Sequence, residues 1–405
     1  MSEPLRVAVC VRCDNRGGVE VAAGRVLRLL EGRGYDVTVI GQGREDVIHE
    51  LIPKSVRVVR PRIHGLAARF IGNYPIYVHL GAKTIRLRTG RLSSLARRML
   101  RLFGDTRNLN VSYDYVVRHF AGLPETTFDV VLDFQGYGCV ETAIAAAIPA
   151  LRKATWVHDA EFGWMPESHP YLHRFDRIFC VSQSVKQVMD SRYPEFSTRT
   201  SVLYTPIDVK AIRKKALEQV ASPRGIGVDF DGITIVTLAR LSPEKNVALA
   251  IRTAAELHKM GVPFRWLVFG DGSRRSHLGR MIANARLEGC MTLCGSVDNP
   301  YPYVANADCY VQTSRSEGFG LAVQEARILG TPVVATDIPA FREQIRDGVT
   351  GFLCESDAKS IASAIARLQA DPEMRHDMRR ALQEENSGQT HWPDPFYAFL
   401  EGKDA

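Results

Sequence analysis

The strongest constraint on the fold is a repeated order of strand, glycine turn and helix. Residues 6–11 (RVAVCV) are an apolar run suited to a buried strand, and the glycine turn NRGGVE follows it. Residues 21–34 then show the helical spacing of apolar side chains, and DVTVIG at 36–41 is the next expected strand. This order predicts the start of a parallel sheet of the nucleotide-binding type.

The same alternation continues along the chain and then begins again near residue 232. Further strands are expected at 128–135, 153–159, 175–182, 233–240 and 264–272, and in the runs MTLCGSV, ADCYVQTS, PVVATDI and GFLCES. At 405 residues the chain is too long for one core of ordinary size. We therefore predict an α/β fold with two Rossmann-like domains that face each other across a cleft. The polar stretch 217–232 is the expected link, which places the domains at 1–215 and 216–389.

The formal net charge of +7 is concentrated in one segment. Residues 54–107 contain thirteen Lys and Arg and one acidic residue, Asp105. Within them, 91–103 places its apolar side chains on one helical face, which suits either a helix lying on an anionic membrane or a surface helix packed on its own domain. Nucleic acid is not expected as a partner, because the segment lacks a known binding motif and interleaved aromatic residues.

The cysteines and the chain start bear on location and on metals. The start MSEPLRVAVCVRC lacks the features of a secretory signal, so we expect a cytoplasmic protein, at the inner face of the membrane if the basic segment binds lipid. Cys10 with Cys13 and Cys290 with Cys294 are the only close cysteine pairs. No neighbouring His or Cys completes either pair at the spacing of a zinc finger, so we expect no metal site.

Two loops of the predicted sheets are candidates for binding phosphate. Gly17 and Gly18 follow the first strand, but they match neither a dinucleotide fingerprint nor a Walker loop, and a plain tight turn explains them equally well. Arg240 and Lys245 follow the first strand of the second set, where both cations would lie at the mouth of the cleft. The alternative for this pair is an exposed arginine beside a lysine in a first helical turn.

The stretch SRSEGFGLAVQEA at 314–326 combines a glycine turn with two carboxylates, Glu317 and Glu325. The turn and helix start consist of Gly318, Phe319, Gly320 and Leu321. Free N–H groups of such a helix start suit a phosphate, and a carboxylate on either side suits hydroxyl groups. A nucleoside diphosphate joined to a sugar has that layout. The alternative is a capping carboxylate followed by a surface glutamate.

Two other features have weaker signals. His158, in WVHDAEFGW, follows a strand of the first domain and would face the cleft, although a single histidine is as often structural. Asp229-Phe230-Asp231 imitates the D-x-D metal motif of some sugar-transfer enzymes. It precedes a strand instead of following one, so we interpret it as a turn.

The chain resembles the retaining GT-B-fold glycosyltransferases named for their Glu-x7-Glu motif, a family with many bacterial capsule, exopolysaccharide and lipopolysaccharide enzymes. The resemblance rests on GGVE (17–20), WVHD (156–159), FCVSQSV (179–185), LARLSPEKN (238–246), FGDG (269–272), ADCYVQTSRSEGFGLAVQEA (307–326) and LGTPVVATDIPAFREQIRDGVTGFL (329–353). The last two blocks together are highly specific. One departure is Thr205 in TPID, where relatives usually carry asparagine.

The resemblance implies a role for each matching residue. Arg240 and Lys245 would hold the donor diphosphate, Glu325 the ribose hydroxyls and Glu317 the transferred sugar. The amides of Phe319, Gly320 and Leu321 would lie near the phosphates, and His158 and Gly17-Gly18 would approach the donor from the first domain, on the acceptor side. The final helix, at about 390–405, would pack back on that domain.

The implied activity is transfer of a hexosyl or N-acetylhexosaminyl group, with retention, from a nucleotide-sugar donor to a saccharide or lipid-linked acceptor. No metal or other cofactor is expected. Uridine diphosphate is the preferred carrier, with guanosine diphosphate-mannose as the alternative. A phosphorylase or epimerase on the same fold, or a catalytically silent protein that binds membrane or nucleic acid, are the competing functions.

Overall fold

The computed structural model contains two compact α/β units. Unit 1 comprises Met1–Val181, Lys186–Pro206 and Trp392–Ala405, and unit 2 comprises Ser182–Val185 and Ile207–His391. The residues that the structure describes are 3–12, 17–41, 51–60, 62–63, 77–79, 84–86, 120–121, 124–136, 140–161, 165–219, 230–385 and 394–403.

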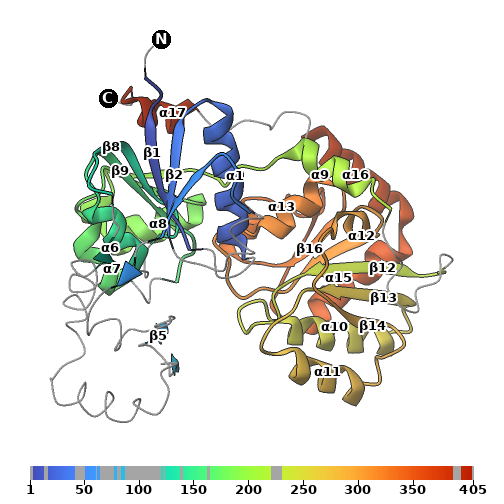
Figure 1. Cartoon of the computed structure of the whole chain (residues 1–405). Helices are drawn as coiled ribbons and strands as arrows, with labels where there is room; N and C mark the ends of the chain where they lie inside the picture. The colour runs from blue at the N-terminus through green and yellow to red at the C-terminus, as the bar shows by residue number, and fades with distance from the viewer. Residues whose placement is uncertain are drawn as a thin grey trace, which may run out of the picture. The chain divides into compact units, whose positions relative to one another are not determined.

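Unit 1 is built on a parallel sheet whose described strands lie in the order β11-β10-β9-β8-β1-β2-β3 (Figure 1). The strands are β1 (Arg6–Cys10), β2 (Asp36–Ile40), β3 (Arg57–Val59), β8 (Phe128–Asp133), β9 (Ala150–Val157), β10 (Arg177–Cys180) and β11 (Thr200–Val202). The helices are α1 (Gly18–Gly32), α6 (Val140–Ala147), α7 (Met165–Leu172), α8 (Gln183–Arg192), the short 3-10 helix η3 (Pro194–Phe196) and α17 (Asp394–Glu401). Two further antiparallel pairs join β4 (Arg62–Ile63) to β7 (Phe120–Ala121) and β5 (Tyr77–His79) to β6 (Thr84–Arg86).

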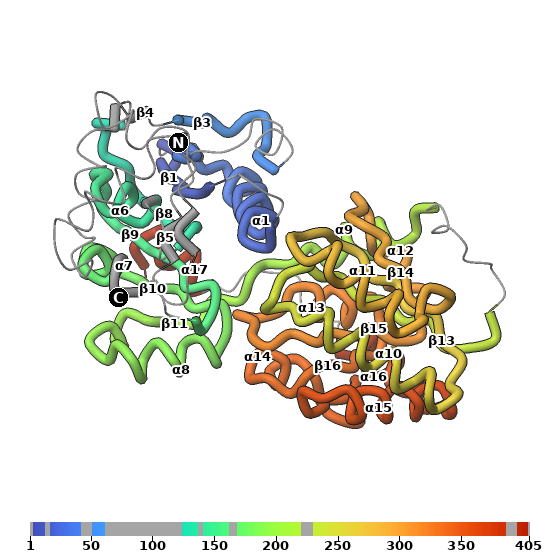
Figure 2. Tube along the Cα trace, turned by 90° about the horizontal axis from the view of Figure 1, so that it is seen from below, coloured from blue at the N-terminus to red at the C-terminus, as the bar shows by residue number. Residues whose placement is uncertain are grey.

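The C-terminal helix α17 packs in unit 1, far in sequence from its neighbours (red in Figures 1 and 2). The Phe396 ring lies 6.1 Å from the ring of Trp156 and 5.9 Å from that of Phe179. Arg152 Nη2 donates to the carbonyl of Leu400 at 2.5 Å. The chain therefore returns to its first unit after completing the second.

Unit 2 has a parallel sheet with strands in the order β14-β13-β12-β15-β16-β17. The strands are β12 (Ile233–Leu238), β13 (Phe264–Phe269), β14 (Met291–Gly295), β15 (Cys309–Gln312), β16 (Val333–Thr336) and β17 (Gly351–Cys354). The helices are α9 (Val209–Ala216), α10 (Val247–Lys259), α11 (Arg275–Asn284), α12 (Tyr301–Ala305), α13 (Leu321–Ile328), α14 (Pro339–Arg342), α15 (Ala358–Ala370) and α16 (Pro372–Glu385).

Alternate side chains of the unit 2 strands enter two separate apolar layers, as the period of two in a strand requires. Ile235 and Val311 face the layer formed with α10, α11 and α15, whereas Val236 and Tyr310 face the layer formed with α12, α13 and α14. The sheet is thus covered on both faces, which explains why its strands are nearly continuous apolar runs.

In each unit the strand order reverses beside one central strand. β1 lies between β2 and β8 in unit 1, and β12 lies between β13 and β15 in unit 2. Ligands of open α/β sheets bind beyond the carboxyl ends of the strands at such a reversal. The loops after β12 and β15 are therefore where a ligand of unit 2 is expected.

The predicted fold class, with two Rossmann-like α/β domains, is confirmed by these two parallel sheets. The predicted boundary at 215/216 falls one residue before the end of α9, and α9 groups with unit 2 because Val209 and Ile212 pack against Ile328. The amphipathic segment 91–103 and most of the basic segment lie outside the described residues. Among the helices described, none combines the length and apolar character that a membrane span requires.

Candidate functional site

The loop after β12 carries the two predicted cations and is anchored on both sides. Arg240 is exposed, and the backbone on either side of it bonds to the neighbouring turn: Ala239 N to Phe269 O and Leu241 N to Asp271 O, both at 2.9 Å. A side chain on Gly270 would place its Cβ 2.0 Å from the carbonyl oxygen of Ala239. The glycine in FGDG is therefore required by close packing of two loops, which holds Arg240 at the end of its strand.

Lys245 and Glu317 form an ion pair that joins the loop after β12 to the loop after β15. Lys245 Nζ donates to Glu317 Oε1 at 2.6 Å and to Oε2 at 2.7 Å. The side chains are 22% and 10% exposed, so the pair is partly shielded from water and still accessible. The structure thus brings together two residues that were predicted to bind different parts of a ligand.

The Gly-Phe-Gly turn begins α13 through a left-handed residue. Gly320 is the N-cap of the helix with φ +91°, and its Cβ would lie 2.6 Å from Cε1 of Phe341. Gln344 Nε2 donates to the carbonyl oxygen of Phe319. The turn is therefore held by the side chains of Phe341 in α14 and of Gln344, two residues after that helix. The amides of the first turn of α13, from Leu321 on, lie at the helix start.

Glu325 lies within α13, one turn beyond its first residues, and is partly exposed. Tyr301 OH, at the start of α12, donates to Glu325 Oε1 at 3.3 Å. In sequence, Glu317 precedes the start of α13 and Glu325 follows it.

The predicted residues of unit 1 follow strands of its sheet, Gly17 and Gly18 after β1 and His158 after β9. Gly17 is the N-cap of α1, and no atom lies within 4 Å of a Cβ built on Gly18. Gly18 is thus not required by packing. His158 follows β9, and its Nε2 lies 2.6 Å from the carbonyl oxygen of Phe134, which follows β8.

His158 is neutral at physiological pH. Burial lowers its pKa to about 4, and the hydrogen bond to Phe134 opposes that effect only in part. Because a carbonyl oxygen only accepts, Nε2 carries the proton and donates to it, which leaves Nδ1 as an acceptor. The ring can therefore accept a hydrogen bond from a hydroxyl group of a ligand.

Asp133, the last residue of β8, holds the turn that follows this strand and contains Phe134 and Gly136. It is fully buried, accepts from Thr155 Oγ1 at 2.7 Å and accepts from Gly136 N at 3.1 Å. Burial raises its pKa to about 6 despite these bonds. Gly136 has φ +80°, and a Cβ there would lie 2.3 Å from the carbonyl oxygen of Trp156 and 3.2 Å from the ring of His158, so the turn after β8 is tightly specified.

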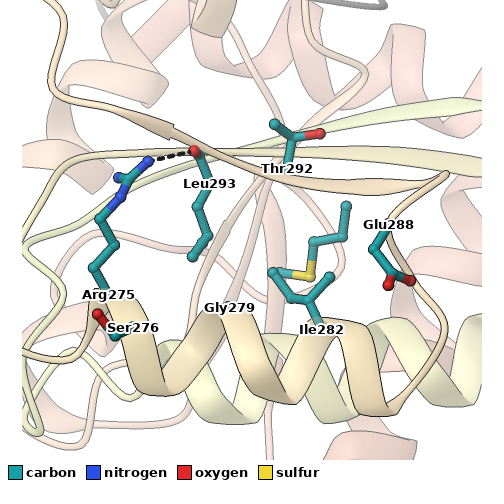
Figure 3. Close-up of a pocket in the computed structure, with 8 residues that line it drawn as sticks. Arg275, Ser276, Gly279, Ile282, Glu288, Thr292 and Leu293 are labelled. Carbon is teal, nitrogen blue, oxygen red and sulfur yellow. Dashed lines mark hydrogen bonds between the residues drawn. The ribbon is translucent and has the colours of Figure 1, made fainter.

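The remaining candidates have other positions. Cys10 is buried in β1, while Cys13 and Asp229 lie outside the described residues. A pocket of about 450 Å³ lies between α11 and β14 (Figure 3). Its Arg275 donates from Nη2 to the carbonyl oxygen of Leu293 at 3.0 Å, which protects the free edge of β14. That pocket is separate in sequence from the Lys245 and Glu317 loops.

Sequence reasoning missed the polar residues behind Glu317. Ser314 Oγ donates to Glu317 Oε1 at 2.7 Å, and Ser314 is itself bonded to Gln312. The available signal was the pattern YVQTS, which places polar side chains at alternate positions of a strand that must be buried.

Residues 222–385 match the family model described as "Glycosyl transferases group 1". Unit 2 is a domain of this family. The group 1 domain contains all the predicted unit 2 residues, from Arg240 to Glu325.

Curated relatives are matched over part of their length. The "O-antigen biosynthesis glycosyltransferase WclY" of Escherichia coli is 34% identical over 170 residues, which are 42% of this chain and 45% of that protein. The chain is thus aligned with less than half of that relative.

Solved structures match over both units. A TarM mutant from S. aureus, in complex with Fondaparinux, alpha-GlcNAc-glycerol and UDP, has a TM-score of 0.70 at 12% identity and covers 99% of this chain and 100% of its own. HepE from Anabaena, in complex with UDP, has a TM-score of 0.67 at 17% identity, with 99% and 97% covered. These likenesses show that the chain has the GT-B fold.

Proposed function

We propose that the protein is a retaining glycosyltransferase that moves a sugar from a uridine-diphosphate donor to a saccharide or lipid-linked acceptor of a bacterial surface polysaccharide or glycoconjugate. The observation that carries the proposal is the Lys245–Glu317 pair at the strand reversal of a group 1 domain, beside the start of α13. Such a site offers a cation and free amides to phosphate and carboxylates to hydroxyl groups.

The uridine nucleotide and the type of product are supported by relatives. TarM and HepE were solved with UDP, and WclY is named for O-antigen biosynthesis. Glu325, paired with Tyr301, would accept from the ribose hydroxyls. Neutral His158 and the open backbone at Gly18 would serve the sugar and the acceptor from unit 1.

The proposed reaction is attack of an acceptor hydroxyl on the same face of the sugar that the diphosphate leaves. The bond between the anomeric carbon and the phosphate oxygen breaks, the bond to the acceptor oxygen forms, and the acceptor proton passes to the departing diphosphate. Arg240, Lys245 and the amides of α13 would stabilise the developing charge, so electrostatic stabilisation and positioning supply most of the acceleration. No metal ion is needed in this scheme.

Glu317 is assigned to orienting the sugar and not to covalent attack. Its Oε1 already accepts from Lys245 and Ser314, and its Oε2 accepts from Lys245. A carboxylate engaged in this way is a weaker nucleophile, and its remaining lone pair suits a sugar hydroxyl.

The test is a thermal-shift panel of UDP, GDP and their sugars on the whole chain, followed by a transfer assay in the presence of EDTA with NMR of the product anomer. Uridine nucleotides should stabilise the protein, by about 2.7 kcal/mol at a hundred times the dissociation constant. Lys245→Ala should reduce transfer about 100-fold, whereas Lys259→Ala, an exposed lysine of α10, is the matched control. Selective stabilisation by GDP-mannose would show that the donor is a guanosine nucleotide and not a uridine nucleotide. A product with inverted anomeric configuration, or full activity of Lys245→Ala, would refute the mechanism.

A further inference from the structure

Three polar side chains lie on the buried face of a core strand in unit 2. Tyr310 and Gln312 point to the same side of β15, and Ser314 continues their alternation beyond the strand end. They are 0%, 2% and 0% exposed, within or next to the apolar layer that includes Val236 and Phe341. Buried polar groups reduce stability unless each has a hydrogen-bond partner, so their partners are informative.

The three side chains form a continuous hydrogen-bonded chain that ends on Glu317. Tyr310 OH lies 2.7 Å from Gln312 Oε1, and Gln312 Nε2 lies 2.9 Å from Ser314 Oγ. Ser314 Oγ lies 2.7 Å from Glu317 Oε1. At its other end, Tyr310 OH is 3.2 Å from the backbone N of Leu238, the last residue of β12.

The chemistry of Glu317 fixes the direction of every bond in this chain. An ionised carboxylate only accepts, so the Ser314 hydroxyl must donate to it and accept from the Gln312 amide NH₂. Gln312 Oε1 then faces Tyr310, and the single hydroxyl hydrogen of Tyr310 points to this oxygen at 2.7 Å and not to the Leu238 carbonyl oxygen at 3.2 Å. The same hydroxyl accepts from Leu238 N. All donors therefore point toward the carboxylate, and bonds aligned in this way polarise one another.

The chain determines which atoms of the ion pair are left for a ligand. Glu317 has about four acceptor positions, of which Ser314 and the two Lys245 bonds take three. Lys245 has three donor hydrogens, of which Glu317 takes two. Among the described residues, the contacts within the pair and with Ser314 thus leave one acceptor position on Glu317 Oε2 and one hydrogen on Lys245 Nζ for a ligand. A sugar hydroxyl beside a phosphate would satisfy both.

We propose that Tyr310, Gln312 and Ser314 are positioning residues that hold Glu317 and Lys245 in this arrangement for the sugar end of the donor. The inference rests on the proposed function, because it assigns the sugar to Glu317. It predicts that breaking the chain impairs transfer more than nucleotide binding, since UDP alone has no sugar for Glu317 to orient.

The first experiment compares Ser314→Ala, Gln312→Met and Tyr310→Phe in the whole chain. The transfer rate at saturating donor should fall about 30-fold, 10-fold and 3-fold in that order, while the UDP dissociation constant from calorimetry stays within threefold. Thr237→Val is the matched control, because Thr237 is as buried but does not belong to the hydrogen-bonded chain. Thr237 accepts from Trp266 Nε1 at 3.0 Å and donates to Val311 O at 2.7 Å. This variant should retain the wild-type rate. The proposal would be overturned if the transfer rates of the variants followed their losses in the free energy of unfolding and not their positions along the hydrogen-bonded chain.

A second measurement needs no ligand and separates this inference from the proposed function. The second measurement is a double-mutant cycle on urea unfolding with Gln312→Met and Glu317→Gln. Both residues are hydrogen-bonded to Ser314, so we expect Ser314 to couple them. We expect the double variant to depart from additivity by at least threefold in the unfolding equilibrium constant, whereas Thr237→Val with Glu317→Gln should be additive. Additive effects of Gln312→Met and Glu317→Gln would overturn the proposed hydrogen-bonded chain, whatever the donor assays show. A protein that shows this coupling but binds no nucleotide would refute the proposed function alone.

Discussion

At the scale of single residues, Asp133 and His158 of unit 1 titrate in opposite senses. Burial raises the pKa of Asp133 to about 6 and lowers the pKa of His158 to about 4. A carboxyl whose folded pKa is raised loses stability as pH rises from its unfolded pKa to its folded pKa. A histidine whose folded pKa is lowered gains stability as pH rises from about 4 to its unfolded value. The two contributions largely cancel between pH 4 and 6.

Asp133→Asn should therefore reveal a pH dependence that the wild type conceals. Relative to the wild type, the variant should gain about 2 kcal/mol in the free energy of unfolding between pH 4.5 and pH 7, because it lacks the penalty for ionising a buried carboxyl. Urea unfolding at a series of pH values measures this difference. Asp129→Asn, on the same strand and partly exposed, is the matched control for replacing a carboxyl group by an amide. A constant difference across the range would contradict the assignment.

At the scale of elements, the start of α13 depends on one backbone conformation. Gly320 has φ +91°, a region that costs other residues about 1–3 kcal/mol, and its Cβ would also meet the ring of Phe341 at 2.6 Å. Gly348 has φ +73°, but no atom lies within 4 Å of a Cβ there. Substituting alanine at Gly348 therefore introduces backbone strain alone, whereas substituting it at Gly320 introduces backbone strain and a steric conflict.

Gly320→Ala should lower the free energy of unfolding by more than Gly348→Ala does, and it alone should weaken UDP binding, because a shifted turn misplaces the first amides of α13. We expect an affinity loss of about tenfold, or about 1.4 kcal/mol. Urea unfolding and calorimetry of both variants measure the two effects. Equal losses of stability with unchanged affinity would show that Phe341 yields and that the turn is not specified by this contact.

The elements also show what the sequence could and could not predict. Long apolar runs and the Gly-Phe-Gly turn identified the central strands and the start of α13, because these signals are local. The three-residue strands β3 and β11 were missed, since such short edge strands with partly exposed residues show little periodicity. The Lys245–Glu317 contact joins residues 72 apart, and the Tyr310–Ser314 chain depends on which face of β15 is buried. Such pairings follow from strand order, which no local spacing encodes.

At the scale of the whole molecule, both ends of the chain belong to unit 1, and unit 2 is formed by the sequence between them. Phe396 is fully buried against Trp156 and Phe179, and Leu382 of α16 is fully buried in unit 2. A cavity made at either position should weaken its own unit. A protein of two cores need not unfold in one transition, so the two units can be distinguished by calorimetry.

Phe396→Ala should remove about 3–5 kcal/mol from unit 1, because it deletes a buried ring and leaves a cavity. Leu382→Ala should remove about 2–5 kcal/mol from unit 2. In differential scanning calorimetry, each variant should lower the melting temperature of a different transition. UDP should raise the melting temperature of only the transition that Leu382→Ala lowers, because a ligand stabilises the unit that binds it. A single transition that both variants lower alike, and that UDP raises in both, would mean that the units unfold together and that α17 contributes to the donor-binding unit as much as to its own.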